Sequence, residues 1–299
     1  MLARRLLEIV VIDSSFWRER RVFLTGHTGF KGAWLSLMLE RLCARVTGYG
    51  LAPATDPSLY DLARAGENLC DVRGDICDAA MLDGALRAAD PDIVIHLASR
   101  PPRDGAPVSP HAVERLKKTG GPEVLEAVLN APSVQAAVFV SPEAAYVSLD
   151  WLDLTSKSDA HIVSLHCPDP IGGGDFAAER GAEPTRFGEA APMHVLDALY
   201  GVLLLAERAA CAGEGLARAW SFSSDTHAAR PEAIGFSPLL DARETVHWMT
   251  DWREAFEARC DMRAGALDCV DAYLGRRVRL TSPFARTDAA PEWRRAAGA

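Results

Sequence analysis

The chain has 299 residues, of which 48% are hydrophobic and 24% charged, and its formal net charge is −9. This composition excludes a wholly disordered chain, and an acidic chain without a cluster of Lys and Arg is not expected to bind nucleic acid. The length allows two domains, or one domain with a smaller appended part.

Cysteine spacing and the N-terminal stretch indicate the cellular compartment of the protein. The seven cysteines are scattered and form no C-x-x-C pair, which predicts reduced thiols and no metal site. Glu8 and Asp13 interrupt the apolar run near the N-terminus, so it does not read as a signal peptide. No stretch approaches the roughly 18 apolar residues of a membrane span. We therefore expect a cytoplasmic protein without a membrane partner.

Strand and helix signals alternate along the first half of the chain, as in a parallel sheet with crossover helices. The predicted strands are Arg21–Thr25, Val46–Tyr49, Asn68–Val72, Asp92–Leu97, Ala137–Ser141, His161–His166 and Ala219–Ser223. The predicted helices are Lys31–Arg45, Ala79–Ala88, His111–Ala131 with a break at Gly120–Pro122, Val195–Cys211, Asp241–Arg259 and Ala264–Leu274, before an unstructured tail. The pattern predicts an α/β fold.

A glycine-rich turn joins the first predicted strand to the first helix. Gly26, Gly29 and Gly32 recur at three-residue spacing in the run G-H-T-G-F-K-G. Such glycines permit a tight turn, let a pyrophosphate approach backbone N–H groups, and let helix and strand pack closely. The alternative is a turn that gives the same fold without a ligand. The predicted dinucleotide contacts here are Gly26, Thr28, Gly29, Phe30, Lys31 and Gly32.

Two further segments line the same predicted crevice. Asp75, after the third strand, is placed to meet the adenine amino group, and the segment after the fourth strand to meet the pyrophosphate. The second strand ends in Tyr49-Gly50-Leu51, without the acidic residue that usually holds the adenosine ribose. The choice between NAD and NADP therefore stays open. The predicted contacts from these segments are Asp75, Ile76, Leu97, Ala98 and Ser99.

With these motifs, the sequence resembles the extended short-chain dehydrogenase/reductase superfamily and, within it, the CDP-glucose 4,6-dehydratases. The resemblance implies a Rossmann-type doubly wound parallel sheet with a reduced C-terminal helical subdomain, and a nicotinamide dinucleotide. We divide the chain into an extension (1–15), a dinucleotide-binding core (16–175) and a reduced substrate region (176–299) that returns one helix and one strand to the core. The runs that carry the resemblance are Phe16–Leu35, Thr47–Leu59, Gly74–Asp78, His96–Ala98, Ile171–Phe176, His194–Glu207 and Asp261–Leu274.

The resemblance also implies a catalytic Tyr-x-x-x-Lys pair, which this chain lacks. In the superfamily the tyrosine acts as base, and the lysine lowers the pKa of the tyrosine and binds the nicotinamide ribose. Residues 142–160, between the fifth and sixth predicted strands, leave no room for a long catalytic helix with its preceding loop. In such a pair the lysine stands four positions after the tyrosine. At those positions, this chain has Pro53, Arg64, Asp150, Leu204 and Arg277 after its five tyrosines.

Other segments of the family pattern are also altered. The segment that follows Phe176, where the family holds its sugar nucleotide, is shortened. Family members commonly dimerise through two helices; here one is interrupted at Gly120–Pro122 and the other is missing. We therefore expect any homodimer to use an altered interface.

His161 and His166 are interpreted as strand residues with hydrogen-bond partners, not as metal ligands.

Three functional hypotheses follow. In the first, the protein has lost redox chemistry and catalyses a cyclisation, elimination or isomerisation of a small molecule in secondary metabolism, with a dinucleotide retained in a non-redox or structural role. In the second, it is a non-catalytic scaffold that binds NAD. In the third, it is an active sugar-nucleotide dehydratase, although it lacks the general base, which contributes roughly 10²–10⁴-fold to catalysis.

The first hypothesis assigns roles to residues at the carboxyl ends of the later strands. Glu143 serves as general acid or base if burial raises its pKa, and Tyr146 donates a hydrogen bond to a carbonyl or enolate. The alternatives are a solvated loop carboxylate for Glu143, a core-edge aromatic for Tyr146 and a surface lysine for Lys157. The candidate catalytic residues are Ser141, Glu143 and Tyr146, and the candidate substrate-binding residues are Arg100, Lys157 and Asp169.

Overall fold

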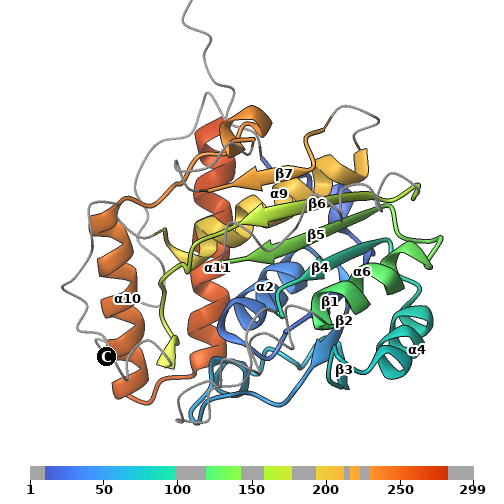
Figure 1. Ribbon diagram of the computed structural model, residues 1–299. Coiled ribbons are helices and arrows are strands. Elements are labelled where there is room, and N and C mark those ends of the chain that lie inside the picture. The colour runs from blue at the N-terminus through green and yellow to red at the C-terminus, as the bar shows by residue number, and fades with distance from the viewer. Residues whose placement is uncertain are drawn as a thin grey trace, which may run out of the picture.

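The computed structural model describes residues 11–98, 119–142, 158–176, 193–211, 216–222 and 229–281. One twisted sheet runs through the molecule, with helices against both of its faces (Figure 1). Its seven strands pair in parallel in the order β3-β2-β1-β4-β5-β6-β7, so the strand order reverses between β1 and β4. The strands are β1 (Arg21–Thr25), β2 (Arg45–Gly50), β3 (Cys70–Arg73), β4 (Ile93–His96), β5 (Ala136–Ser141), β6 (His161–His166) and β7 (Ala219–Ser221).

Helices cover both faces because the strands are apolar on both faces. Val22 and Leu24 of β1 belong to one hydrophobic core, whereas Phe23 between them belongs to the other. Helices α2 and α9 contribute to the first core, and α4 and α6 to the second, which confirms the predicted doubly wound sheet. The helices are α1 (Ser14–Trp17), α2 (Phe30–Arg41), α3 (Leu59–Leu62), α4 (Ala79–Ala89), α6 (Gly121–Leu129), α9 (Val195–Cys211), the 3₁₀-helix η2 (Pro231–Ile234), α10 (Ala242–Glu257) and α11 (Met262–Thr281).

Two predicted helix boundaries were wrong. Helix α2 ends at Arg41, because Cys43 takes a left-handed backbone (φ 58°), and Arg45 already belongs to β2. The backbone at the predicted break stays helical: residues 119–120 form a π turn, and α6 begins at Gly121. Pro122 then lies in the first turn of α6, where its missing N–H breaks no hydrogen bond of that helix.

The C-terminal helix is longer than predicted because a buried ion pair holds its end. Helix α11 continues past Leu274 to Thr281, in a stretch expected to be unstructured. Arg277 and Asp197 are both buried, with Nη2 2.8 Å from Oδ1, and Tyr273 donates its hydroxyl to the same carboxylate oxygen at 2.6 Å. This pair anchors α11 to α9.

Among helices in the described ranges, none has the length and hydropathy of a membrane span.

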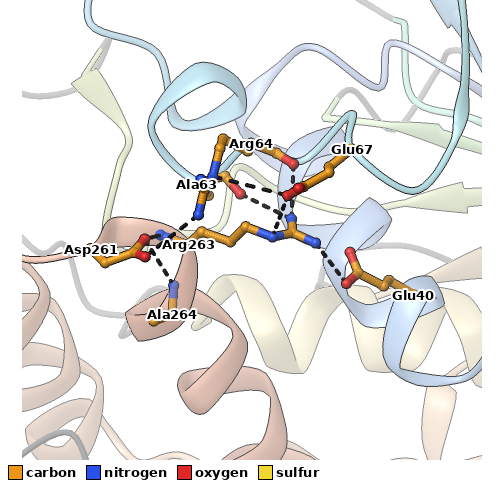
Figure 2. Close-up of polar contacts among 7 residues, drawn as sticks. All are labelled: Glu40, Ala63, Arg64, Glu67, Asp261, Arg263 and Ala264. Atoms are coloured by element: carbon orange, nitrogen blue, oxygen red, sulfur yellow. Dashed lines mark hydrogen bonds and ion pairs between the residues drawn. The ribbon is translucent and has the colours of Figure 1, made fainter.

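Arg263, at the start of α11, joins the C-terminal helix to the first half of the chain (Figure 2). Its Nη1 donates to the carbonyls of Ala63 and Arg64 at the end of α3, at 3.3 and 2.8 Å. Its other nitrogens lie 2.8 Å from the carboxylates of Glu40 on α2 and of Glu67. One guanidinium therefore fixes α2, α3 and α11 relative to one another.

Candidate functional site

The glycine turn after β1 is packed too closely for side chains at two positions. Gly26 has a positive φ of 74°, and a Cβ there would lie 2.9 Å from the backbone nitrogen of Ala98, just after β4. A Cβ on Gly32 would lie 2.1 Å from the carbonyl oxygen of Gly26. The two glycines therefore let the turn lie against both the end of β4 and the first turn of α2, as their spacing predicts.

Gly29 is exposed and leaves the N-terminus of α2 open. It is the N-cap residue, no side chain caps the helix, and a Cβ there would meet only the Gly26 oxygen, at 3.4 Å. The first N–H groups of a helix need partners, and they favour negative charge. This opening therefore fits the pyrophosphate of a dinucleotide. Lys31 in the same turn lies with its Nζ 4.0 Å from Asp169 Oδ1.

Side chains that the sequence did not single out hold the turn in place. The buried His27 ring lies with Nε2 2.9 Å from Asp71 Oδ1 on β3, and Tyr60 donates its hydroxyl to Asp71 Oδ2 at 2.8 Å. Burial lowers the pKa of His27, so the ring is neutral at pH 7. The hydroxyl of Thr28, a predicted cofactor contact, donates to the Leu51 carbonyl at 2.8 Å and thereby ties the turn to β2.

The strand order reverses between β1 and β4, and side chains at the ends of these two strands contact each other. Thr25 Oγ1 lies 2.7 Å from His96 Nδ1 and 3.4 Å from the backbone nitrogen of Ala98. Complete burial lowers the pKa of His96 to about 3, so this ring is also neutral. Leu97 is buried and Ala98 half-buried at this edge. Ser99 lies outside the described residues.

Asp75 and Ile76 follow the end of β3. The Asp75 carboxylate accepts a hydrogen bond from the backbone N–H of Cys77 at 2.9 Å, and its carbonyl accepts one from the Tyr49 hydroxyl at 3.1 Å. Ile76 is buried in the second core. Asp75 is therefore held at the position where the sequence predicted an adenine contact.

On the other half of the sheet, the described side chains come from strand ends. Ser141 is buried at the end of β5 and lies opposite His166 of β6, which lies opposite Ser221 of β7. His166 Nδ1 lies 3.0 Å from Ser221 Oγ, and Nε2 lies 3.2 Å from the Pro142 carbonyl oxygen. Both ring nitrogens of His166 therefore have partners, as predicted. The buried Nε2 of His161, at the opposite end of β6, has no partner among the described residues, which the sequence did not predict.

Of the residues predicted to act on substrate, the structure describes Ser141 and Asp169. Asp169 follows β6, and its Oδ1 lies 4.0 Å from Nζ of Lys31. The segment that follows it, Gly172–Gly174, packs against α2, where Trp34 Nε1 donates to the Gly173 carbonyl at 3.0 Å. Within the described ranges, no three His, Cys, Asp or Glu side chains are grouped to hold a metal. The remaining candidates, Arg100, Glu143, Tyr146 and Lys157, lie outside those ranges.

The sheet and the open helix terminus define a Rossmann-type dinucleotide fold, and comparison with known proteins shows what the chain is similar to. The sequence pattern of the NAD dependent epimerase/dehydratase family matches residues 22–163. A CDP-glucose 4,6-dehydratase from Salmonella typhimurium is 28% identical in an alignment of 292 positions, gaps included, that covers 81% of each chain. Residues 22–163 are therefore similar to the NAD-dependent epimerase/dehydratase family, and most of the chain is similar to one CDP-glucose 4,6-dehydratase.

Solved structures share the fold at lower sequence identity. The Bordetella bronchiseptica enzyme WbmF, in complex with NAD+ and UDP, superposes with a TM-score of 0.62 at 15% identity, covering 88% of this chain and 99% of WbmF. An epimerase from Methanothermobacter thermautotrophicus has a TM-score of 0.61 at 17% identity, covering 86% of this chain and 98% of that protein. These likenesses show the same fold across most of the chain.

Proposed function

We propose that the protein binds a nicotinamide dinucleotide at the Gly26–Gly32 turn and catalyses a step without hydride transfer on a small molecule in the adjoining crevice. The absence of a Tyr-x-x-x-Lys pair anywhere in the sequence carries this proposal. The turn supports the cofactor part, because Gly29 leaves the α2 terminus open to an anion. WbmF, which shares the fold, was solved with NAD+.

In this proposal, the chain's own residues perform an elimination, isomerisation or cyclisation. Glu143, two residues beyond β5, moves a proton to or from the substrate, and Tyr146 donates a hydrogen bond to a carbonyl or enolate oxygen. Ser141, at the end of β5, orients the substrate, together with Arg100, Lys157 and Asp169. The bound dinucleotide, whose nicotinamide supplies hydride chemistry in redox enzymes, has a structural role here.

Direct binding tests the cofactor part. Titration of purified protein with NAD+ and NADP+, followed by calorimetry and by thermal unfolding, is expected to show saturable binding and a higher Tm. If neither dinucleotide binds, this part of the proposal is wrong.

The catalytic part is tested in a reconstituted pathway by comparing wild type with Glu143→Gln and Tyr146→Phe. Both variants are expected to lose product while keeping dinucleotide affinity. An unchanged product yield with both variants would exclude these residues, and a protein that binds dinucleotide without affecting any product would be a scaffold.

A sugar-nucleotide dehydratase is the second candidate, because of the 28% identity to CDP-glucose 4,6-dehydratase. Incubation with CDP-glucose and NAD+, followed by detection of the 4-keto sugar, separates the two candidates. We expect no turnover above background, because the base and its partner lysine are missing. Formation of the 4-keto sugar would refute the loss of hydride transfer.

A further inference from the structure

The end of β2 carries an apolar residue where dinucleotide folds commonly carry an acid. A carboxylate at this place hydrogen-bonds the 2′-hydroxyl of the adenosine ribose in NAD, and it repels the 2′-phosphate of NADP. Here the strand ends at Gly50, and Leu51 follows with 43% of its surface exposed. Leu51 removes the usual preference for an unphosphorylated ribose.

Arg73 reaches the same place from the neighbouring strand. It is the last residue of β3 and lies opposite Gly50 in the register of β2 and β3. Its Nη1 donates to the Leu51 carbonyl at 3.1 Å, so the guanidinium lies beside the end of β2. An arginine near the adenosine ribose is the usual partner of a 2′-phosphate.

The guanidinium is held in place but keeps donors for a ligand. Nε and Nη2 donate to Asp71 Oδ2 at 3.1 and 2.6 Å, and the Tyr60 ring lies 5.2 Å from the guanidinium carbon. These bonds and the one to Leu51 use three of the five N–H groups of an arginine. In the described part of the chain, one N–H on each terminal nitrogen is left, and the side chain is 41% exposed.

Asp71 pairs with Arg73 and is itself held by the fold. Its carboxylate also accepts the Tyr60 hydroxyl, and its Oδ1 lies 2.9 Å from His27 Nε2. Tyr60 and His27 are buried on the protein side of this carboxylate, whereas Arg73 is exposed. A phosphate that approaches from solvent therefore meets the guanidinium.

We infer that the dinucleotide site prefers a 2′-phosphorylated adenosine, as in NADP, and that Arg73 is the residue that determines this preference. The inference rests on the proposed function, since it requires a dinucleotide at the Gly26–Gly32 turn. Two charge-assisted hydrogen bonds correspond to a roughly 10- to 100-fold tighter binding of NADP+ than of NAD+.

Calorimetric titrations with NADP+, NAD+, adenosine 2′,5′-bisphosphate and 5′-AMP test the inference directly. Wild type is expected to bind each 2′-phosphorylated ligand at least about tenfold more tightly than its counterpart. Arg73→Gln should remove this difference while leaving the affinity for NAD+ within about twofold. Arg87→Gln, which changes an exposed arginine on α4 that pairs with Asp83, is the matched control and should change nothing.

Leu51→Asp provides a second variant that leaves Arg73 and its contacts in place. The new carboxylate should reverse the preference toward NAD+. Equal or tighter binding of NAD+ by the wild type would overturn the inference and leave the proposed function intact. Failure of all four ligands to bind would overturn both.

Discussion

The two halves of the sheet build their carboxyl edges in different ways. Beside β1 and β2, the backbone forms the site: glycines with little or no room for a Cβ, and an uncapped helix terminus at Gly29. Beside β5, β6 and β7, the described polar groups include the side chains of Ser141, His166 and Ser221, which lie opposite one another in the strand register, with His166 bonded to Ser221. A backbone site persists as long as the fold does, whereas a side-chain site changes by single substitutions. Under the proposed function, this difference explains how the dinucleotide fold could be kept while the substrate chemistry changed.

The largest expected effect is on stability, at the buried ion pair that anchors α11 to α9 beside β5 and β6. Arg277→Met leaves the buried Asp197 carboxylate without its cation, so we expect a loss of about 3–5 kcal/mol in the free energy of unfolding. Urea denaturation followed by circular dichroism measures it. Arg276→Met, the matched control, removes a partly exposed pair with Glu244 and should cost no more than about 1 kcal/mol. Equal losses in both variants would mean that the buried pair is not the anchor.

The next largest expected effect is on dinucleotide binding, through a glycine substitution in the Gly26–Gly32 turn. Gly32→Ala puts a Cβ 2.1 Å from the Gly26 oxygen, which displaces the turn and should weaken dinucleotide binding by about 100-fold. Gly84→Ala on α4 is the matched control, because its Cβ meets nothing within 4 Å, and it should leave binding unchanged. Titration calorimetry compares the two variants. Full affinity in Gly32→Ala would show that the ligand does not depend on the turn.

The smallest expected effect is the pH dependence of stability, to which two buried histidines, His96 and His194, contribute. Burial lowers the pKa of both His96, beside β1, and His194, before α9, to about 3, from a reference of 6.5. The unfolded chain therefore binds more protons below pH 6.5, and stability falls as the pH drops from there toward 3. At pH 5.5 each ring should cost about 1 kcal/mol relative to pH 7.5.

Urea midpoints of wild type, His96→Gln and His194→Gln at these two pH values test this effect. Each variant should lose about half of the wild-type pH dependence that the two rings produce. If both variants keep the full dependence, other groups cause the acid destabilisation.

The sequence predicted elements well where local pattern decides. The bounds of β6 and α9 are those predicted, because apolar periodicity alone marks them. The end of α2 was missed because Cys43, a non-glycine residue, takes a left-handed backbone. The end of α11 was missed because Arg277 is buried through its pair with Asp197. That partner lies 80 positions away in the sequence, where local pattern does not reveal it.

The site shows the same division. The Gly26–Gly32 turn is local and was predicted, whereas the contact of His27 with Asp71 depends on the pairing of β2 with β3 and on burial. No spacing rule in the sequence gives that contact, or places Arg73 beside Leu51. The proposed roles of Arg100, Glu143, Tyr146 and Lys157 stay predictions.

The Arg263 cluster limits how this protein can be divided for engineering. Because one guanidinium binds Glu40 of α2 and the two carbonyls that follow α3, a fragment that ends before residue 263 loses the partner of both groups. Glu40 lies on the helix whose first turn faces the predicted pyrophosphate. A minimal dinucleotide-binding fragment must therefore carry α11, supplied either in the same chain or as a separate peptide that restores the contact.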